Sequence, residues 1–259
     1  MQTVLLRTIY VAGRHSSLES TTRARNVSIS SFFGLMARLC LLRTTTRYLR
    51  AMSTTRRPGR SALPATERGR RSRAAIVDAA AAAIYANGVA ATSLDDVLTS
   101  AGCGKSQLYH YFSGKAELVR AVIERQLELV LDCQPEIHRV DSWAGLRRWV
   151  DQIVDMHRAP GGPFACPLGS LAAELKGDET YAESLALAFG RWESLLAAGL
   201  RKMRDRGQLP PGADPESLSR SILATLQGSM LLARVHGDVT IVSDAMDKAL
   251  ATMQPRKGR

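Results

Sequence analysis

The sequence is poor in the residues that carry catalysis, metal binding and covalent cross-links. Its four cysteines lie far apart and include no Cys-x-x-Cys pair, so they predict neither a zinc site nor a disulfide framework. The five histidines are scattered, and no Ser/His/Asp set, carboxylate pair or metal-ligand spacing emerges. We therefore predict a protein that is not an enzyme, uses no metal or cofactor, and resides in a reducing, cytoplasmic compartment.

Long apolar runs and strand patterns are missing as well. The apolar patch at 32–37 is followed by Arg38 and is too short to span a bilayer, which argues against a membrane partner. Aromatic residues make up only 5% of the chain, while hydrophobic residues make up 45%. That composition suits an alanine- and leucine-rich helical protein better than a β-sandwich, and it predicts an all-α fold.

Positive charge is concentrated in one segment. Residues 1–66 hold eleven basic residues and one acid, so they supply +10 of the net +11, and the remainder supplies only +1. This leader has no sustained period and is predicted to be disordered. Residues 1–51 are either a mis-annotated start ahead of Met52 or, by their arginine-rich composition, a segment like a transit peptide. The arginines from Arg56 to Arg73 either contact DNA phosphates or form a solubilising arm.

The stretch 92–115 predicts two short helices joined by a tight turn. Gly102-Cys103-Gly104 interrupts an apolar face that resumes after the turn. The apolar residues are Leu94, Val97 and Leu98 before the turn and Leu108 and Phe112 after it. This is the pattern of a helix-turn-helix, whose second helix begins near Lys105 and presents polar side chains to a major groove.

Apolar residues recur at helical spacing through the rest of the chain, between caps and breakers. Asn87-Gly88 is predicted to end the first helix, Thr92-Ser93 to cap the next, and Ser113 to cap the fourth. Asp214 followed by Pro215 marks another helix start. Besides the two helices of the turn motif, the predicted helices are 67–87, 114–133, 142–157, a short one opening at Cys166-Pro167, 180–208, 215–236 and 239–253.

Several residues of this stretch together resemble the DNA-binding domain of the TetR family of one-component bacterial transcription regulators. They are Ser93-Leu94-Asp95-Asp96-Val97, Ala101-Gly102, Lys105, Leu108-Tyr109-His110-Tyr111-Phe112, Lys115 and Leu118. The motif match covers roughly 67–122, and beyond it the resemblance is one of helix layout. It implies about nine helices: a helix-turn-helix three-helix domain over 67–115, a helical ligand-binding and dimerisation domain over 116–254, and a tail at 255–259.

The resemblance also implies roles in DNA binding. Lys105, Ser106, Gln107 and His110 would face bases, while Thr92, Ser93, Tyr109, Tyr111 and Lys115 would hold phosphates, with Arg73 on the arm. For the two tyrosines, packing against the first helix is the alternative. Gly104 stands where the family usually has Ser or Thr, which puts in doubt any contact that a hydroxyl would make.

In the second domain the resemblance implies an apolar inducer cavity between the middle helices and a homodimer built by the last two. The pocket candidates are Trp149, Met156, Phe164, Cys166, Phe189 and Trp192, for each of which an ordinary core position is the alternative. His157, Glu174 and Arg191 are polar candidates, with a surface position as the alternative. Cys166, beside a proline, could react with electrophiles. Small residues at Ala224, Gly228, Ser229 and Ala233 would permit close helix approach between protomers.

The predicted function is a TetR-like regulator whose homodimer binds a palindromic double-stranded DNA operator. It would act as a repressor that a small, mostly apolar inducer releases, although nothing in the sequence excludes activation. One alternative is a ligand-independent architectural DNA-binding protein. Another is a nucleotide-binding enzyme, suggested by Gly104-Lys105-Ser106, but Thr99 occupies the position of the first glycine of a phosphate-binding loop.

Overall fold

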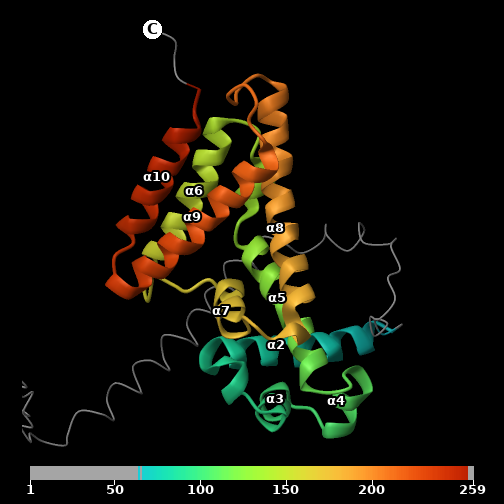
Figure 1. The fold of residues 1–259 in the computed structure, drawn as a ribbon. Coiled ribbons are helices and arrows are strands. Elements are labelled where there is room, and N and C mark those ends of the chain that lie inside the picture. Colours follow the sequence, from blue (N-terminus) through green and yellow to red (C-terminus); the bar gives the residue numbers. More distant parts are fainter. Residues whose placement is uncertain (1–63, 65, 256–259) are drawn as a thin grey trace, which may run out of the picture.

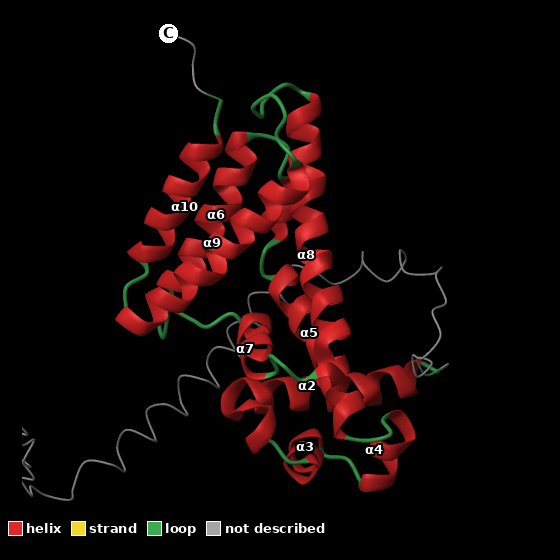
Figure 2. Cartoon of the chain, in the orientation of Figure 1, coloured by secondary structure: helices red, strands yellow, loops and turns green. Residues whose placement is uncertain are grey.

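The computed structural model describes residues 64 and 66–255, so the predictions for the leader up to Arg60 lie outside the described residues. Within these residues the chain is all-helical, with nine α-helices, one 3-10 helix and no strand (Figures 1 and 2). The α-helices are α2 (Glu67–Ala91), α3 (Leu94–Ala101), α4 (Lys105–Tyr111), α5 (Lys115–Asp132), α6 (Trp143–Arg158), α7 (Pro167–Glu174), α8 (Glu179–Asp205), α9 (Pro215–His236) and α10 (Thr240–Met253). The 3-10 helix η1 (Pro135–Arg139) links α5 to α6 and was not predicted.

Local caps explain where most of these helices begin, and two caps differ from the prediction. Ser93 caps α3 as expected. Gly88 has φ 84° and ψ 166°, which kinks α2 instead of ending it, and one further turn continues to Ala91. Gly114, not Ser113, is the N-cap of α5; the Ser113 backbone N–H instead donates to Glu117 Oε2 over 2.7 Å. No side chain in the described part of the chain caps the first turn of α5, and the Glu117 hydrogen bond instead fixes the residue that precedes the cap.

The helices are arranged between two ends of the molecule (Figure 1). α2, α3 and α4 pack together at one end, and α6, α9 and α10 lie at the other. α5 contacts α2 at one end and α8 along its length, while α8 packs against α9. The short helix α7 contacts both α2 and α5.

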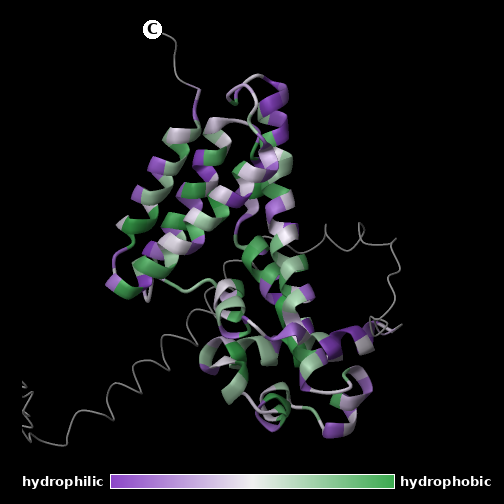
Figure 3. Cartoon of the chain, in the orientation of Figure 1, coloured by the Kyte–Doolittle hydropathy of each residue, from purple (hydrophilic) through white to green (hydrophobic). Residues whose placement is uncertain are grey.

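One buried apolar cluster runs through both ends, from Ile76 in α2 to Leu250 in α10. Figure 3 shows that hydrophobic positions alternate with hydrophilic ones along the helices. Trp149 and Trp192 are both fully buried in this cluster, and each such side chain stabilises the fold by about 3 kcal/mol. Because α5 belongs to this continuous core, the predicted boundary at 115 falls at the first residue of a helix shared by both parts. The two-domain division stays a prediction.

Among the described residues, α2 alone is long and apolar enough to cross a membrane by length and composition. Its apolar window has a mean hydropathy of 1.5, and 33% of that window is buried inside the protein. Ile76, Ala80 and Ile84 on its inner face pack in the core. Core helices of soluble proteins share these features, so the window is weak evidence for a membrane span.

Candidate nucleic-acid interface and ligand pocket

The start of α4 is a polar surface held on a buried apolar base. Leu108 and Phe112 are 0% and 1% exposed, which fixes the rotation of the helix. On the opposite side Lys105, Ser106 and His110 are exposed, and Tyr109 is 57% exposed. Gly102 ends α3 with φ 62°, a conformation that favours glycine and makes the tight turn possible. The four exposed side chains therefore share one accessible surface.

Lys105 forms an ion pair across the turn. Its Nζ lies 3.1 Å from Asp95 Oδ1, with the two side chains 71% and 73% exposed. An ion pair this exposed is worth between about 0 and 1 kcal/mol, so the ammonium group can exchange its carboxylate for another anion at little cost.

Two residues predicted to contact DNA are engaged within the protein. Thr92 is 3% exposed and its hydroxyl donates to the Gly88 carbonyl over 2.7 Å, so in this conformation the side chain is engaged inside the protein. Gln107 is half-buried, and its Nε2 donates to Ser72 Oγ over 3.1 Å. Gln107 therefore ties α4 to α2. The break predicted at Gly88 is a kink, after which the chain continues to Ala91 and Thr92.

Ser93 is exposed, but it takes part in a capping box. The Asp96 backbone N–H donates to Ser93 Oγ over 3.1 Å, and the Ser93 N–H donates to Asp96 Oδ2 over 3.0 Å. The Asp96 carboxylate accepts from the Ser93 hydroxyl over 2.6 Å as well as from the Ser93 N–H, and these two hydrogen bonds lower the pKa of Asp96. The box fixes the start of α3 and thereby the orientation of the whole turn motif.

The remaining predicted contacts border the same surface. Lys115 is the first residue of α5 and is half-buried, as is Tyr111, whose ring meets His110 edge-on with centroids 4.9 Å apart. The Arg73 guanidinium lies 5.0 Å from the centre of the Phe112 ring. Arg73 and Lys115 thus bring positive charge from α2 and α5 to the flanks of α4.

The local structure is unlike a phosphate-binding loop. Gly104-Lys105-Ser106 follows α3, whereas the nucleotide motif requires a preceding β-strand. In the part of the chain that the structure describes, no three His, Cys, Asp or Glu residues gather in a way that could hold a metal ion.

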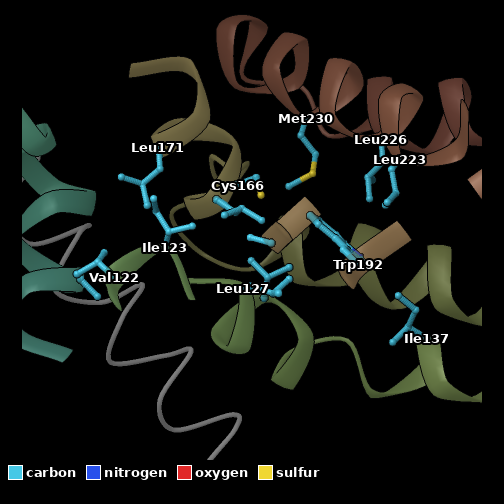
Figure 4. Packing of buried hydrophobic residues seen from close by; sticks show 14 of the residues in the cluster. Val122, Ile123, Leu127, Ile137, Cys166, Leu171, Trp192, Leu223, Leu226 and Met230 are labelled. Carbon is cyan, nitrogen blue, oxygen red and sulfur yellow. The ribbon is translucent and has the colours of Figure 1, made fainter. Parts of the chain in front are cut away.

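A pocket lies among α5, α6, α7, α8 and α9. It is lined by Val130, Gln134, Met156, His157, Phe164, Ala165, Cys166, Pro167, Trp192 and Met230. Cys166, Trp192 and Met230 approach it from three different elements (Figure 4). In this conformation its inner space is about 20 Å³, room for about one water molecule. The lining combines aromatic rings and flexible thioethers with few polar groups, as ligand pockets do.

Of the six residues predicted for a pocket, Met156, Phe164, Cys166 and Trp192 line this one. The other two, Trp149 and Phe189, do not line the pocket but contact residues that do. Trp149 is fully buried, and its Nε1 donates to Gln134 Oε1 over 3.1 Å. Phe189 stacks on Trp192 with ring centroids 6.5 Å apart.

His157 is the polar member of the pocket that sequence reasoning underestimated. It is 1% exposed, whereas a surface position was favoured, and its Nδ1 accepts the backbone N–H of Phe164 over 3.0 Å. Burial lowers the pKa of His157 to about 4, so the ring is neutral at pH 7 and its proton is on Nε2. The spacing of Trp149, Ile153 and His157 along α6 had already placed this histidine on the buried face.

Arg191 and Glu174, the other polar candidates, lie outside the pocket, and the surroundings of Cys166 disfavour the thiolate form. Arg191 and Glu174 are exposed, and Glu174 Oε1 accepts the Ala90 backbone N–H over 3.0 Å. Cys166 is buried and its Sγ accepts the Gly169 N–H over 3.4 Å. Burial raises the pKa of the Cys166 thiol, which keeps it protonated and disfavours the predicted reaction with electrophiles.

An exposed apolar stripe follows the outer face of α9. Leu231 and Val235 are 65% and 69% exposed, and Ala224 and Gly228 precede them at helical spacing on the same face. Ser229 and Ala233, which were predicted to face a partner, are buried within the protein. Large exposed apolar side chains in a row are typical of protein interfaces.

The turn motif and the helical body together define a helix-turn-helix transcription regulator. Residues 76–122 match the family model of bacterial regulatory proteins of the TetR family, and residues 143–249 match the tetracyclin repressor-like C-terminal domain. The chain is 30% identical over 176 residues to an HTH-type transcriptional regulator of Lactococcus lactis, an alignment that covers 66% of this chain and 88% of that protein. The chain belongs to the TetR family.

Further relatives agree with this assignment. An HTH-type transcriptional regulator of Mycobacterium tuberculosis is 29% identical over 177 residues, covering 64% of this chain and 85% of its own length. The reduced form of Escherichia coli NemR has a TM-score of 0.64 at 18% identity and covers 71% of this chain and 98% of its own. The SmeT complex with triclosan has a TM-score of 0.56 at 24% identity, covering 72% and 93%. These solved structures establish a shared fold.

Proposed function

We propose that this TetR-family regulator is a cytoplasmic repressor whose homodimer binds a palindromic operator through α4 of each protomer. The exposed polar start of α4, held above buried Leu108, is the observation that carries the proposal. Helices of this kind enter a major groove, where base edges offer donors and acceptors to side chains. In this proposal Lys105, Ser106 and His110 contact bases, and Tyr109, Tyr111, Ser93, Lys115 and Arg73 contact phosphates.

A gel shift tests this proposal. The full chain, mixed with DNA flanking its own gene and a non-specific competitor, is expected to give a discrete band. The double variant Tyr109→Ala, Lys115→Ala is expected to lose that band without a change in melting temperature. Lys248→Ala, which removes an exposed lysine on α10, is the matched control and keeps it. A folded wild-type dimer that selects no sequence, either here or in a genome-wide binding selection, would contradict the proposal.

We propose that the exposed stripe on α9 is the dimer interface, because a two-fold dimer suits a palindromic site. Val235→Glu places a charge in the stripe and is expected to yield a monomer mass by light scattering at micromolar concentration. Ala182→Glu, on an exposed position near the start of α8 and away from the stripe, is the control and stays dimeric. A wild-type protein that is already monomeric would rule the interface out.

Release by a ligand is the remaining part of the proposal. The pocket is too small in this conformation for more than a water molecule, so a ligand must displace the flexible side chains of Met156 and Met230. Cys166 and Pro167 join the pocket to the start of α7, and Glu174 at its other end hydrogen-bonds Ala90, close to the start of α3. A ligand that favours the open pocket would therefore favour a different placement of α3 and α4.

The pocket favours this proposal over a ligand-independent architectural protein. A structural neighbour, SmeT, has been solved with triclosan, which supports a ligand-binding role within this fold. Recovery of free operator DNA upon addition of a pocket ligand is the expected result. An operator complex that no pocket ligand weakens would favour the architectural alternative.

A further inference from the structure

The pocket contains two hydrogen-bond donors that the surrounding protein leaves unsatisfied. His157 Nε2 and Trp192 Nε1 are buried, and neither has a hydrogen-bond partner in the described part of the chain. The two residues are 1% and 0% exposed. A buried N–H without a partner is destabilising, so native proteins contain few of them.

Both residues line the same pocket, and both nitrogens are donors. An indole nitrogen can only donate. The imidazole of His157 has its other nitrogen occupied as an acceptor by the Phe164 N–H, which leaves the proton on Nε2. Two residues of the pocket lining thus carry N–H groups without an acceptor among the described residues, and a ligand with a hydrogen-bond acceptor would satisfy them.

The rest of the lining restricts what that acceptor can be. No Lys, Arg, Asp or Glu lines the pocket, and the imidazole is neutral at pH 7 because burial lowers its pKa to about 4. A carboxylate would therefore be buried without a countercharge, at a large desolvation cost. The aromatic rings of Phe164 and Trp192 and the thioethers of Met156 and Met230 suit a flat aromatic body.

We propose that the ligand of this pocket is a small, neutral aromatic compound whose carbonyl oxygen accepts hydrogen bonds from His157 Nε2–H and Trp192 Nε1–H. A carbonyl oxygen has two lone pairs and can accept both. The inference rests on the proposed ligand-responsive function and narrows its chemistry from any apolar molecule to one with an acceptor.

A matched pair of probes tests it. Acetophenone carries the carbonyl, and α-methylstyrene has the same skeleton with a methylene group in place of the oxygen. Both are titrated into the full chain while the indole N–H resonances of its three tryptophans are followed by proton–nitrogen correlation NMR. Acetophenone is expected to bind about tenfold more tightly, a difference of about 1.4 kcal/mol, and to move the Trp192 signal downfield. Benzoate, which is charged at pH 7, is expected to bind more weakly than acetophenone.

Variants locate the effect. Trp192→Phe and His157→Phe keep an aromatic ring but remove a donor, and each is expected to reduce the preference for acetophenone. Trp143→Phe is the control, because its Nε1 donates to the Gln208 carbonyl over 3.0 Å and lies outside the pocket. If His157→Phe fails to fold after losing the acceptor for Phe164 N–H, Trp192→Phe and the indole signal decide the question.

Equal affinity for acetophenone and α-methylstyrene, binding of neither, or an unmoved Trp192 signal overturns the inference. The gel shift tests the proposed repressor function separately from acceptor recognition by the pocket. Release of operator DNA by both probes equally would support a ligand-responsive repressor and contradict acceptor recognition. A Trp192 shift specific to acetophenone, with the operator complex unchanged, would support the acceptor site and contradict ligand-driven release.

Discussion

At the DNA-binding end of this molecule polar groups are exposed or paired, whereas at the pocket end two polar groups are buried without a partner among the residues that the structure describes. Around α4 the polar side chains are exposed or paired: Lys105 with Asp95, Gln107 with Ser72, and Ser93 with Asp96. In the pocket, His157 and Trp192 keep donors out of water without a partner. The polar groups of the turn motif therefore need no further partner, whereas a ligand that supplies a hydrogen-bond acceptor would stabilise the pocket.

The two ends also differ in how they are built. The turn motif is held by its caps, by the hydrogen bond from Gln107 to Ser72 in α2 and by the buried side chains of Leu108 and Phe112. The pocket is assembled from side chains of five helices and has space for about one water molecule, so it must open to admit a ligand. Opening is the step that can transmit a signal, because α7 connects the pocket to α2.

The largest expected effect concerns the buried histidine. The folded-state pKa of His157, about 4, lies below its ordinary value of 6.5, so the unfolded chain binds the extra proton first. Its contribution to stability is complete above about pH 6.5 and is lost as the pH falls toward 4, by about 3 kcal/mol in all. Urea unfolding between pH 7 and 4 is expected to show a steeper loss for wild type than for His157→Gln.

The exposed His110→Gln variant is the control for that comparison and should keep the wild-type slope. Parallel slopes for wild type and His157→Gln would show that His157 does not remain neutral in the folded protein.

At the DNA-binding end we expect Lys105→Ala to weaken operator binding about tenfold, because one charge-assisted contact is lost at the start of α4. If that contact is to a phosphate, the slope of log affinity against log salt falls by about 1. If it is to a base, specificity at one position relaxes instead. Gel shifts over a salt series measure both, and Lys248→Ala on α10 should match wild type.

The contact that joins the two ends is expected to matter less for stability and more for coupling. Glu174→Ala removes the acceptor of the Ala90 N–H, which lowers the free energy of unfolding by about 1 kcal/mol. It is also expected to reduce the effect of a pocket ligand on DNA affinity. Glu183→Ala, an exposed acid on α8, is the control. If a pocket ligand weakens DNA binding as much in Glu174→Ala as in wild type, the Glu174–Ala90 hydrogen bond does not couple the pocket to the DNA-binding helices.

The contrast between the ends explains what the sequence could predict. The turn motif, the cap of α3 and the all-α fold follow from local spacing and are confirmed by the structure. The hydrogen bond of Gln107 joins residues 35 positions apart, which local patterns do not encode. His157 was a pocket candidate with a surface position as the alternative, and the period of α6 places it inside. The unsatisfied donors of His157 and Trp192 depend on how the helices around the pocket pack, and residue spacing along a single helix does not reveal that packing.

The smallest expected effect is a gain in DNA affinity. Asp95 Oδ1 lies 3.1 Å from Lys105 Nζ, so in free protein it competes with DNA for the ammonium group, and its charge repels nearby phosphates. Because the pair is exposed and weak, Asp95→Asn should tighten operator binding only about threefold, with a smaller gain at high salt. In a Lys105→Ala background the competition is gone, so the gain should shrink to the repulsion alone. Equal gains in both backgrounds would show that Asp95 acts through its charge and not through Lys105, and Asp244→Asn on α10 should show none.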